Sequence, residues 1–167
     1  MSIIGNLLRL TPAQLAWLLD DPGQTHAFVH GIVMAELRAA PVSPERARSL
    51  CVEKSWHAIS MLLGRVDFPI DFFAPGVGAD LGEESDDGTD RRYLSAEQVQ
   101  LAADWFTLTT FDELVGDLDP ADPDTKVYWV HWDEPWQVGM VRDHFDELVR
   151  FVTAAAHDGD AILRFFT

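Results

Sequence analysis

The apolar residues between positions 141 and 156 constrain the fold most, because they recur every three or four residues over several turns. This spacing predicts a long amphipathic helix that buries one stripe against another layer of structure. Gly159 is the expected C-cap, and the apolar run at 161–166 predicts a closing strand. The stripe consists of Val141, Phe145, Leu148, Val149, Val152, Ala155 and Ala156.

Three capping boxes mark the starts of further helices. In each box a Ser or Thr is followed three residues later by Gln or Glu, so that side chain and backbone cap each other. The pairs are Thr11–Gln14, Ser95–Gln98 and Thr110–Glu113. The box at Thr11 predicts a short helix after it, and the box at Thr110 predicts a short helix that continues through 118. The box at Ser95 predicts a helix whose inner face consists of Val99, Ala102, Ala103 and Phe106. Leu15, Leu18 and Leu19 form the apolar stripe of the first helix.

Two more helices are expected in the first half of the chain. One spans about 25–40 and ends at Pro41. The other starts at a Ser43-Pro44 cap and continues to Gly64, with a stripe of Val52, Trp56, Ile59 and Leu63. Residues 65–89 predict an irregular stretch. Its end overlaps an acidic loop at about 79–90, which we expect to be exposed and mobile.

Three segments predict strands, at 3–10, 126–132 and 161–166. The segment 126–132 is rich in β-branched and aromatic residues and apolar on both faces. With 167 residues and no linker, the chain predicts a single domain over 1–167. We expect an α+β fold, in which a small mixed or antiparallel sheet is covered by five or six helices.

The chain carries 28 Asp and Glu residues against 12 Lys and Arg, a net charge of −16. This excess argues against binding to nucleic acid or anionic membranes, since both are held by Lys and Arg. No apolar run approaches the roughly 20 residues that span a bilayer. No basic segment precedes the first apolar residues, and the single Cys51 suits a reducing compartment. We therefore expect a cytoplasmic protein.

The known catalytic and metal motifs are not met. His26 and His30 have a zinc-ligand spacing, but Ala27 stands where a metalloprotease helix has Glu. Gly76-Val77-Gly78 lacks the third glycine of a dinucleotide fingerprint and predicts a turn. The acidic loop lacks the alternation of a calcium loop, and no serine lies in a nucleophile elbow. We expect no metal, no cofactor and no identifiable catalytic residue, which favours a non-enzymatic protein.

One group of residues is a candidate binding site because it combines aromatic rings with polar atoms. Such side chains are favoured in binding surfaces, although they also fill cores. On a strand at 126–132, Tyr128 and Trp132 would face opposite to Trp129 and His131. The candidate ligand- or partner-binding residues are His57, Tyr93, Tyr128, Trp132 and Trp136.

Several segments resemble the YfbM-like family, a bacterial domain of unknown function. The opening strand leading into Leu10-Thr11-Pro12 is one, and Lys54-Ser55-Trp56-His57 is another. The run from Tyr93 to Val99, the tryptophans after Tyr128 and the terminal Ala-rich helix complete the likeness. The resemblance covers nearly the whole chain. It implies a single α+β domain and carries no assigned activity or catalytic residues.

Two hypotheses for the function remain. The first is a non-enzymatic binding protein for a basic partner protein, by analogy with intracellular neutralisers of toxic enzymes (immunity-like proteins). The second is a small-molecule-binding protein or enzyme with a pocket lined by His57, Tyr93 and the tryptophans. Against the first stands the simpler interpretation that the negative charge only keeps the protein soluble. The sequence does not indicate the oligomeric state.

Overall fold

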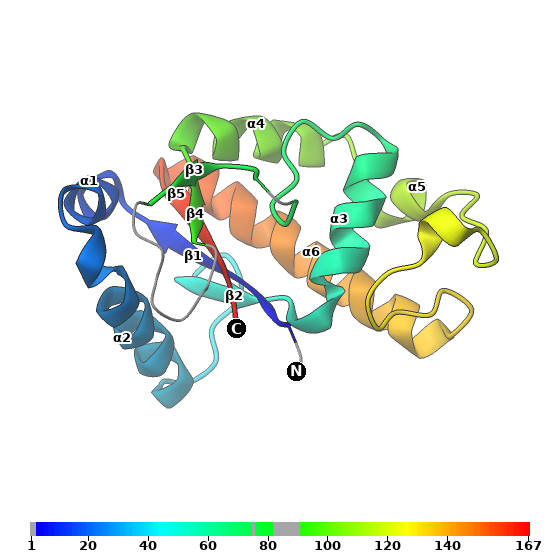
Figure 1. Ribbon diagram of the computed structural model, residues 1–167, viewed down its shortest axis with the longest axis horizontal. Coiled ribbons are helices and arrows are strands. Elements are labelled where there is room, and N and C mark those ends of the chain that lie inside the picture. The colour runs from blue at the N-terminus through cyan, green and yellow to red at the C-terminus, as the bar shows by residue number, and fades with distance from the viewer. Residues whose placement is uncertain (1–2, 75, 82–90) are drawn as a thin grey trace.

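The computed structural model describes residues 3–74, 76–81 and 91–167. These residues form a five-stranded antiparallel sheet in the order β2-β1-β5-β4-β3 (Figure 1). The central strands β1 and β5 pair along their whole length, from Gly5 opposite Phe166 to Leu10 opposite Ala161. The strands are β1 (Gly5–Leu10), β2 (Ser49–Cys51), β3 (Ala79–Asp80), β4 (Arg92–Leu94) and β5 (Ala161–Phe166).

Helices cover both faces of the sheet, because strand residues alternate between two hydrophobic cores. Leu7 and Ile162 point into the larger core, and Leu8 and Leu163 into the smaller one. The helices α3–α6 enclose the larger core, whereas α1 and α2 lie on the other side (Figure 1). The helices are α1 (Pro12–Asp20), α2 (Thr25–Arg38), α3 (Trp56–Arg65), α4 (Ala96–Phe106), α5 (Phe111–Val115) and α6 (Pro135–Asp158). Three short 3₁₀ turns are η1 (Pro22–Gln24), η2 (Glu53–Ser55) and η3 (Pro123–Thr125). The expected α+β class is confirmed.

The predicted helix signals are confirmed at α1, α4, α5 and α6. All three capping boxes form, and Gly159 adopts the left-handed conformation that ends α6 (φ 73°). The inner face of α4 is buried as expected. In α6, Phe151 is also buried, whereas Val149 only borders the core. Within the described residues, no helix has both the length and the apolar character needed to cross a membrane.

The expected helix from 43 to 64 is wrong in its first half. Residues 49–51 instead form the edge strand β2, whose Leu50 pairs with Leu7 of β1. Glu53 then adopts a positive φ of 51°, which an α-helix does not allow, and α3 begins only at Trp56. Val52 is buried as expected, but from a loop. Pairing with β1 therefore overrides the local helical pattern.

The expected strand at 126–132 is also wrong. Trp129 has a φ of 69°, and a residue in the left-handed region interrupts an extended chain. Side chains take the backbone N–H groups that a neighbouring strand would have bound: His57 accepts from Tyr128, and Gln137 from His131. The segment is therefore a loop, and the predicted division of its side chains by a strand pleat does not hold.

Smaller differences concern segment ends. The helix expected through 118 ends at Val115, because Gly116 adopts a φ of 45°. Leu19 is exposed, so the stripe of α1 rests on Leu18 and the partly buried Leu15. Residues 79–80, expected to be irregular, form β3. Most of the expected acidic loop, residues 82–90, lies outside the described residues.

Candidate functional site

The loop from 126 to 134 is fixed to the rest of the molecule at several points. Val130 is buried in the larger core. The indole N–H of Trp132 donates to the Thr125 carbonyl at 2.8 Å. The backbone N–H of Tyr128 donates to Nδ1 of His57 at 2.9 Å, which requires that imidazole to carry its proton on Nε2. The loop therefore has a defined shape although it belongs to no sheet.

This fixed loop and the start of α6 direct large aromatic side chains toward solvent. Trp136 is 59% exposed, and Tyr128 and Trp129 are each 36% exposed. The rings of Trp129 and Trp136 meet edge to face, with centroids 5.7 Å apart and planes at 81°. Rigid, exposed aromatic side chains are typical of binding hot spots, because little conformational entropy is lost when a partner covers them.

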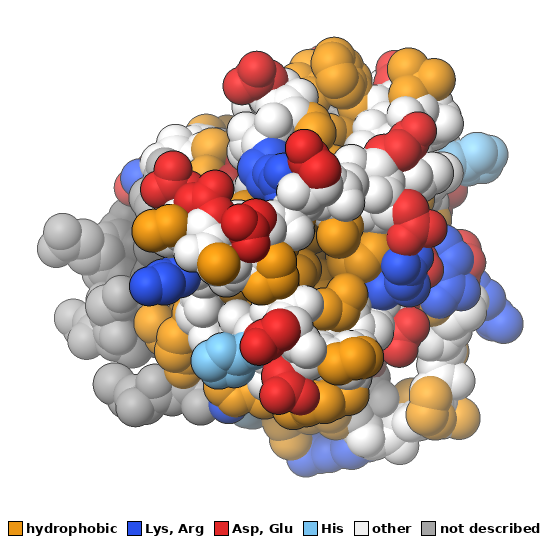
Figure 2. All heavy atoms as spheres, turned by 90° about the vertical axis from the view of Figure 1, so that its right-hand side faces the viewer, with side chains coloured by type: hydrophobic (Ala, Val, Ile, Leu, Met, Phe, Trp, Pro, Cys, Tyr) orange, Lys and Arg blue, Asp and Glu red, His pale blue; other side chains and the backbone are white. Residues whose placement is uncertain are grey.

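Carboxylates surround these aromatic side chains in the sequence. Residues 111–134 contain eight Asp and Glu and one Lys, a net charge of −7 on about a seventh of the chain. All eight are exposed. They are Asp112, Glu113, Asp117, Asp119, Asp122, Asp124, Asp133 and Glu134. We call these eight carboxylates, together with Tyr128, Trp129 and Trp136, the acid–aromatic face. In Figure 2, which shows the right-hand end of Figure 1, acidic and hydrophobic side chains are interspersed.

Six of these carboxylates have no cationic partner among the described residues. Asp112 pairs with Arg142 at 2.6 Å and Asp117 with Arg65 at 3.3 Å. Within the described part of the chain, no Lys or Arg forms an ion pair with the other six. Their charge therefore remains available to a binding partner.

Hydrogen bonds lower the pKa of two carboxyls of the face, Asp112 and Glu113. The Arg142 guanidinium, hydrogen-bonded to Asp112, lowers the pKa of that carboxyl. The backbone N–H and hydroxyl of Thr110 lower the pKa of Glu113, which accepts both hydrogen bonds. Both groups carry their negative charge at neutral pH.

A cation already lies on this face. The ammonium group of Lys54, from η2, is 4.8 Å from the centroid of the Trp129 ring. This is within the distance at which the electron-rich face of an indole attracts a positive charge. The exposed tryptophan thus binds a basic side chain within the chain itself.

The candidate residues expected from the sequence do not form one site. Tyr128 and Trp136 belong to the acid–aromatic face, and His57 supports its loop through the bond to Tyr128. Trp132 is partly buried against the larger core and stabilises the loop from within. Tyr93 lies on β4 and packs against the smaller core, beside Leu163 of β5. The sheet therefore separates Tyr93 from His57.

Sequence-based reasoning missed Trp129, which belongs to the face, and Lys54, whose ammonium group contacts it. Trp129 was assigned to the other face of a strand that does not form. Lys54 lies 75 positions before it, and no spacing rule connects the two. The number of tryptophans between 129 and 136 was the available signal, because three indoles in eight residues exceed what one short loop can bury.

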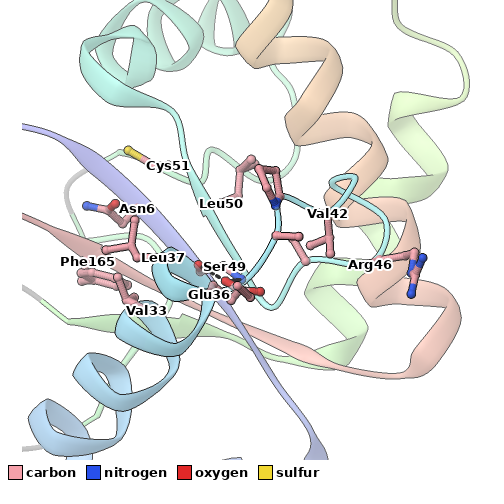
Figure 3. Close-up of a pocket in the computed structure, with 14 residues that line it drawn as sticks. Asn6, Val33, Glu36, Leu37, Val42, Arg46, Ser49, Leu50, Cys51 and Phe165 are labelled. Carbon is pink, nitrogen blue, oxygen red and sulfur yellow. Dashed lines mark hydrogen bonds between the residues drawn. The ribbon is translucent and has the colours of Figure 1, made fainter.

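A groove of about 510 Å³ lies elsewhere, between α2 and the edge strand β2 (Figure 3). Its lining is mainly apolar, and includes Val33, Leu37, Leu50 and Phe165. None of the five candidate residues contributes to it. No sequence motif marks this groove, because it forms only where the packing of α2 against β2 brings residues 33–51 together with Asn6 and Phe165.

The Glu36 carboxylate in the groove is already engaged in hydrogen bonds. The Glu36 carboxylate accepts the backbone N–H and the hydroxyl of Ser49 (Figure 3). It also accepts the backbone N–H of Arg48. Glu36 therefore covers N–H groups at the edge of the sheet, where a further strand could otherwise pair. The sulfur of Cys51 also lines the groove, and burial raises the pKa of its thiol. A ligand site needs convergent polar groups that are free to bind, and this arrangement does not supply them.

A Ser–His contact lies beneath the surface between η2 and α6. The hydroxyl of Ser55 is 2.8 Å from Nδ1 of His144. Ser55 is fully buried, so a substrate cannot reach it, and the contact connects two elements of the core. Burial lowers the pKa of His144 and keeps its imidazole neutral. Among the described residues, no group of three or more His, Cys, Asp or Glu is arranged to hold a metal ion.

Comparisons with known proteins identify the family of the chain and a solved structure with a similar fold. No curated protein matches the chain. A solved structure, that of YfbM from Escherichia coli, a protein of unknown function, is similar over 98% of this chain and 99% of its own. The TM-score is 0.58 and the sequence identity 13%, so this likeness concerns the fold alone. The model of the family DUF1877, a domain of unknown function, matches residues 1–165. The chain therefore belongs to the DUF1877 family and has a YfbM-like domain.

Proposed function

We propose that this protein is a non-enzymatic binding module whose partner is a basic protein that docks on the acid–aromatic face. One observation carries the proposal: the exposed indoles of Trp129 and Trp136 lie in the segment 111–136, which bears nearly half of the net negative charge. Solubility alone would be served by carboxylates spread over the surface. It gives no reason to expose large aromatic rings among them.

The two components have different roles in binding. The carboxylates would attract a positively charged protein over several ångströms and speed its encounter. The aromatic side chains would then be covered and would slow dissociation, as buried anchors do at protein interfaces. The loop is already fixed by His57 and by Trp132, so binding would order few groups.

We also propose the cellular compartment in which the protein would meet such a partner, the cytoplasm. A single cysteine, Cys51, suits the reducing cytoplasm of a bacterium. A neutraliser of a basic enzyme is one kind of protein with this chemistry, and this assignment is an analogy. The alternative is a small-molecule-binding protein or enzyme with a pocket lined by His57, Tyr93 and the tryptophans. The geometry does not support it, since Tyr93 packs against the smaller core, whereas His57 belongs to α3, which covers the other face of the sheet.

The test compares two variants that remove the same charge. Asp133→Asn with Glu134→Gln neutralises part of the acid–aromatic face. Asp20→Asn with Asp21→Asn neutralises two exposed carboxylates at the end of α1, at the opposite end of the molecule (Figure 1). The parent and both variants are immobilised, and the proteins that each retains from a bacterial lysate are identified and quantified by mass spectrometry at rising salt concentration.

We expect the parent to retain a protein with a basic isoelectric point that high salt releases. The variant at 133 and 134 should retain less of it, and the variant at 20 and 21 should retain as much as the parent. If the retained proteins are acidic, or if both variants lose them equally, the proposed docking face is wrong. Recovery of a small molecule in place of a protein would support the alternative function.

A further inference from the structure

The contact between Lys54 and Trp129 indicates how the face would recognise its partner. One surface of the Trp129 indole holds an ammonium group at 4.8 Å from its centroid. Trp136 then meets Trp129 edge to face. In such a pair, one ring presents an edge and cannot cover both surfaces of the other. Trp129 therefore leaves at least one surface of the Trp136 indole uncovered, and Trp136 is 59% exposed.

Anionic groups stand next to this open indole in the chain. Asp133 and Glu134 precede Trp136 by three and two residues, and both are exposed. Glu134 occupies the N-cap position of α6, but its side chain makes no capping hydrogen bond. Neither carboxylate forms an ion pair with a described residue. An aromatic surface and uncommitted carboxylates thus occur together.

We infer that Trp136, with Asp133 and Glu134, forms a site for an arginine side chain of the basic partner. This inference rests on the proposed function and specifies its recognition chemistry. A guanidinium group is planar, so it can stack on the Trp136 indole while its N–H groups donate to carboxylate oxygens at its edge. An ammonium group is a compact and strongly hydrated charge, and it satisfies the two requirements less well.

The test uses three short peptides of the same length, N-acetylated and C-amidated, in a Gly/Ser background. Each contains four arginines, four lysines or four citrullines, and citrulline keeps the shape of arginine without its charge. Binding to the intact protein is followed through the indole N–H signals of its tryptophans in ¹H–¹⁵N NMR spectra. A Trp136→Phe variant assigns the signal of Trp136.

We expect the arginine peptide to shift the signals of Trp136 and Trp129 and to bind several-fold more tightly than the lysine peptide. The citrulline peptide should not bind. Trp136→Leu should weaken binding of the arginine peptide by about 3- to 30-fold, the range of a cation–π contact. Trp17→Leu, on α1, is the matched control, because Trp17 is similarly exposed (45%), and it should leave the affinity unchanged.

The outcomes separate this inference from the proposed function. If the arginine and lysine peptides bind equally, or if Trp136→Leu binds as the parent does, the arginine site is wrong. In that case, weaker and less salt-sensitive binding by the Asp133→Asn, Glu134→Gln variant would still support a basic partner on this face. If the charged peptides bind no better than citrulline, the arginine site and the basic-partner proposal both fail. Because Trp136 is exposed, circular dichroism of the variants should match the parent.

Discussion

Phe145 is the position at which the packing of the larger core can be tested most sharply. Its side chain, in the middle of α6, is 1% exposed. Its ring meets Phe106 of α4 edge to face at 5.7 Å and lies 5.8 Å from Phe111 at the start of α5. Phe145→Ala therefore removes the ring that joins three helices and leaves a cavity between them.

The expected cost of Phe145→Ala is about 3–5 kcal/mol in the free energy of unfolding. Domains of this kind have total stabilities of about 5–15 kcal/mol, so the variant loses a large share. With a urea dependence of about 2 kcal/mol per molar, the midpoint of unfolding should fall by about 2 M. Urea melts followed by circular dichroism measure this change.

The neighbouring residue Asp146 supplies the control. Its side chain is exposed on the same helix, and Asp146→Asn should change the stability by less than about 0.5 kcal/mol. If the midpoint of Phe145→Ala lies within error of the parent, the register of α6 against α4 and α5 is wrong. An equal loss in both variants would indicate a general weakness of the helix rather than a cavity.

Three further predictions concern single positions. Burial lowers the pKa of His144, so as the pH falls its imidazole binds a proton more readily in the unfolded chain than in the folded one. The free energy of unfolding should therefore decrease as the pH drops below about 6.5. His144→Gln should make this decrease smaller, as measured by urea melts at several pH values. Glu36→Ala uncovers the N–H of Ser49 at the sheet edge, should cost about 1.5–3 kcal/mol, and should promote self-association measurable by ultracentrifugation. Gly5→Ala would place a methyl group 2.6 Å from Cβ of Trp56 and should lower the melting temperature, at a cost of about 1–3 kcal/mol.

Each of these predictions has a result that would contradict it. A parent and His144→Gln variant with parallel pH profiles would show that the burial of this imidazole does not affect stability. A monomeric and fully stable Glu36→Ala variant would show that the carboxylate does not protect the edge. An unchanged melting temperature for Gly5→Ala would mean that β1 and α3 are less closely packed than described.

The elements that sequence reasoning identified are those specified by local chemistry. The Thr11, Ser95 and Thr110 boxes need only their own side chains and neighbouring backbone, and each forms as predicted. The stripe of α6 repeats often enough to determine one face. The strands β1 and β5 lie in segments rich in Ile, Leu and Phe, which could be recognised without knowledge of their partners.

The elements that failed depend on contacts distant in the sequence. The helix expected from 43 is replaced by β2, because β1 offers backbone partners and Glu36 covers the outer edge. The strand expected at 126–132 is a loop, because His57 and Gln137 bind its N–H groups. The composition of each segment favours an element that does not form. The conformation depends instead on contacts with residues elsewhere in the chain, such as Glu36 and His57, and a local sequence pattern does not reveal these contacts.

For the candidate site too, local sequence indicated some features, whereas others depend on contacts between distant parts of the chain. The aromatic residues Tyr128 and Trp136 could be selected from composition, and they are exposed as a binding surface requires. The position of Tyr93 behind the sheet and the contact of Lys54 with Trp129 depend on the topology. Net charge alone did not show where the carboxylates lie, and the structure leaves all eight from residues 111–134 exposed at the surface.

Docking of a basic protein on the acid–aromatic face can be measured through its association kinetics, with the protein that the immobilised parent retains as the partner. The association rate should fall as ionic strength rises from about 0.01 to 0.15 M, because the Debye length shrinks from about 30 to 8 Å. Asp133→Asn with Glu134→Gln should reduce both this rate and its salt dependence, whereas Trp136→Ala should mainly speed dissociation. An association rate that is indifferent to salt, or a dissociation rate unchanged by Trp136→Ala, would contradict the account.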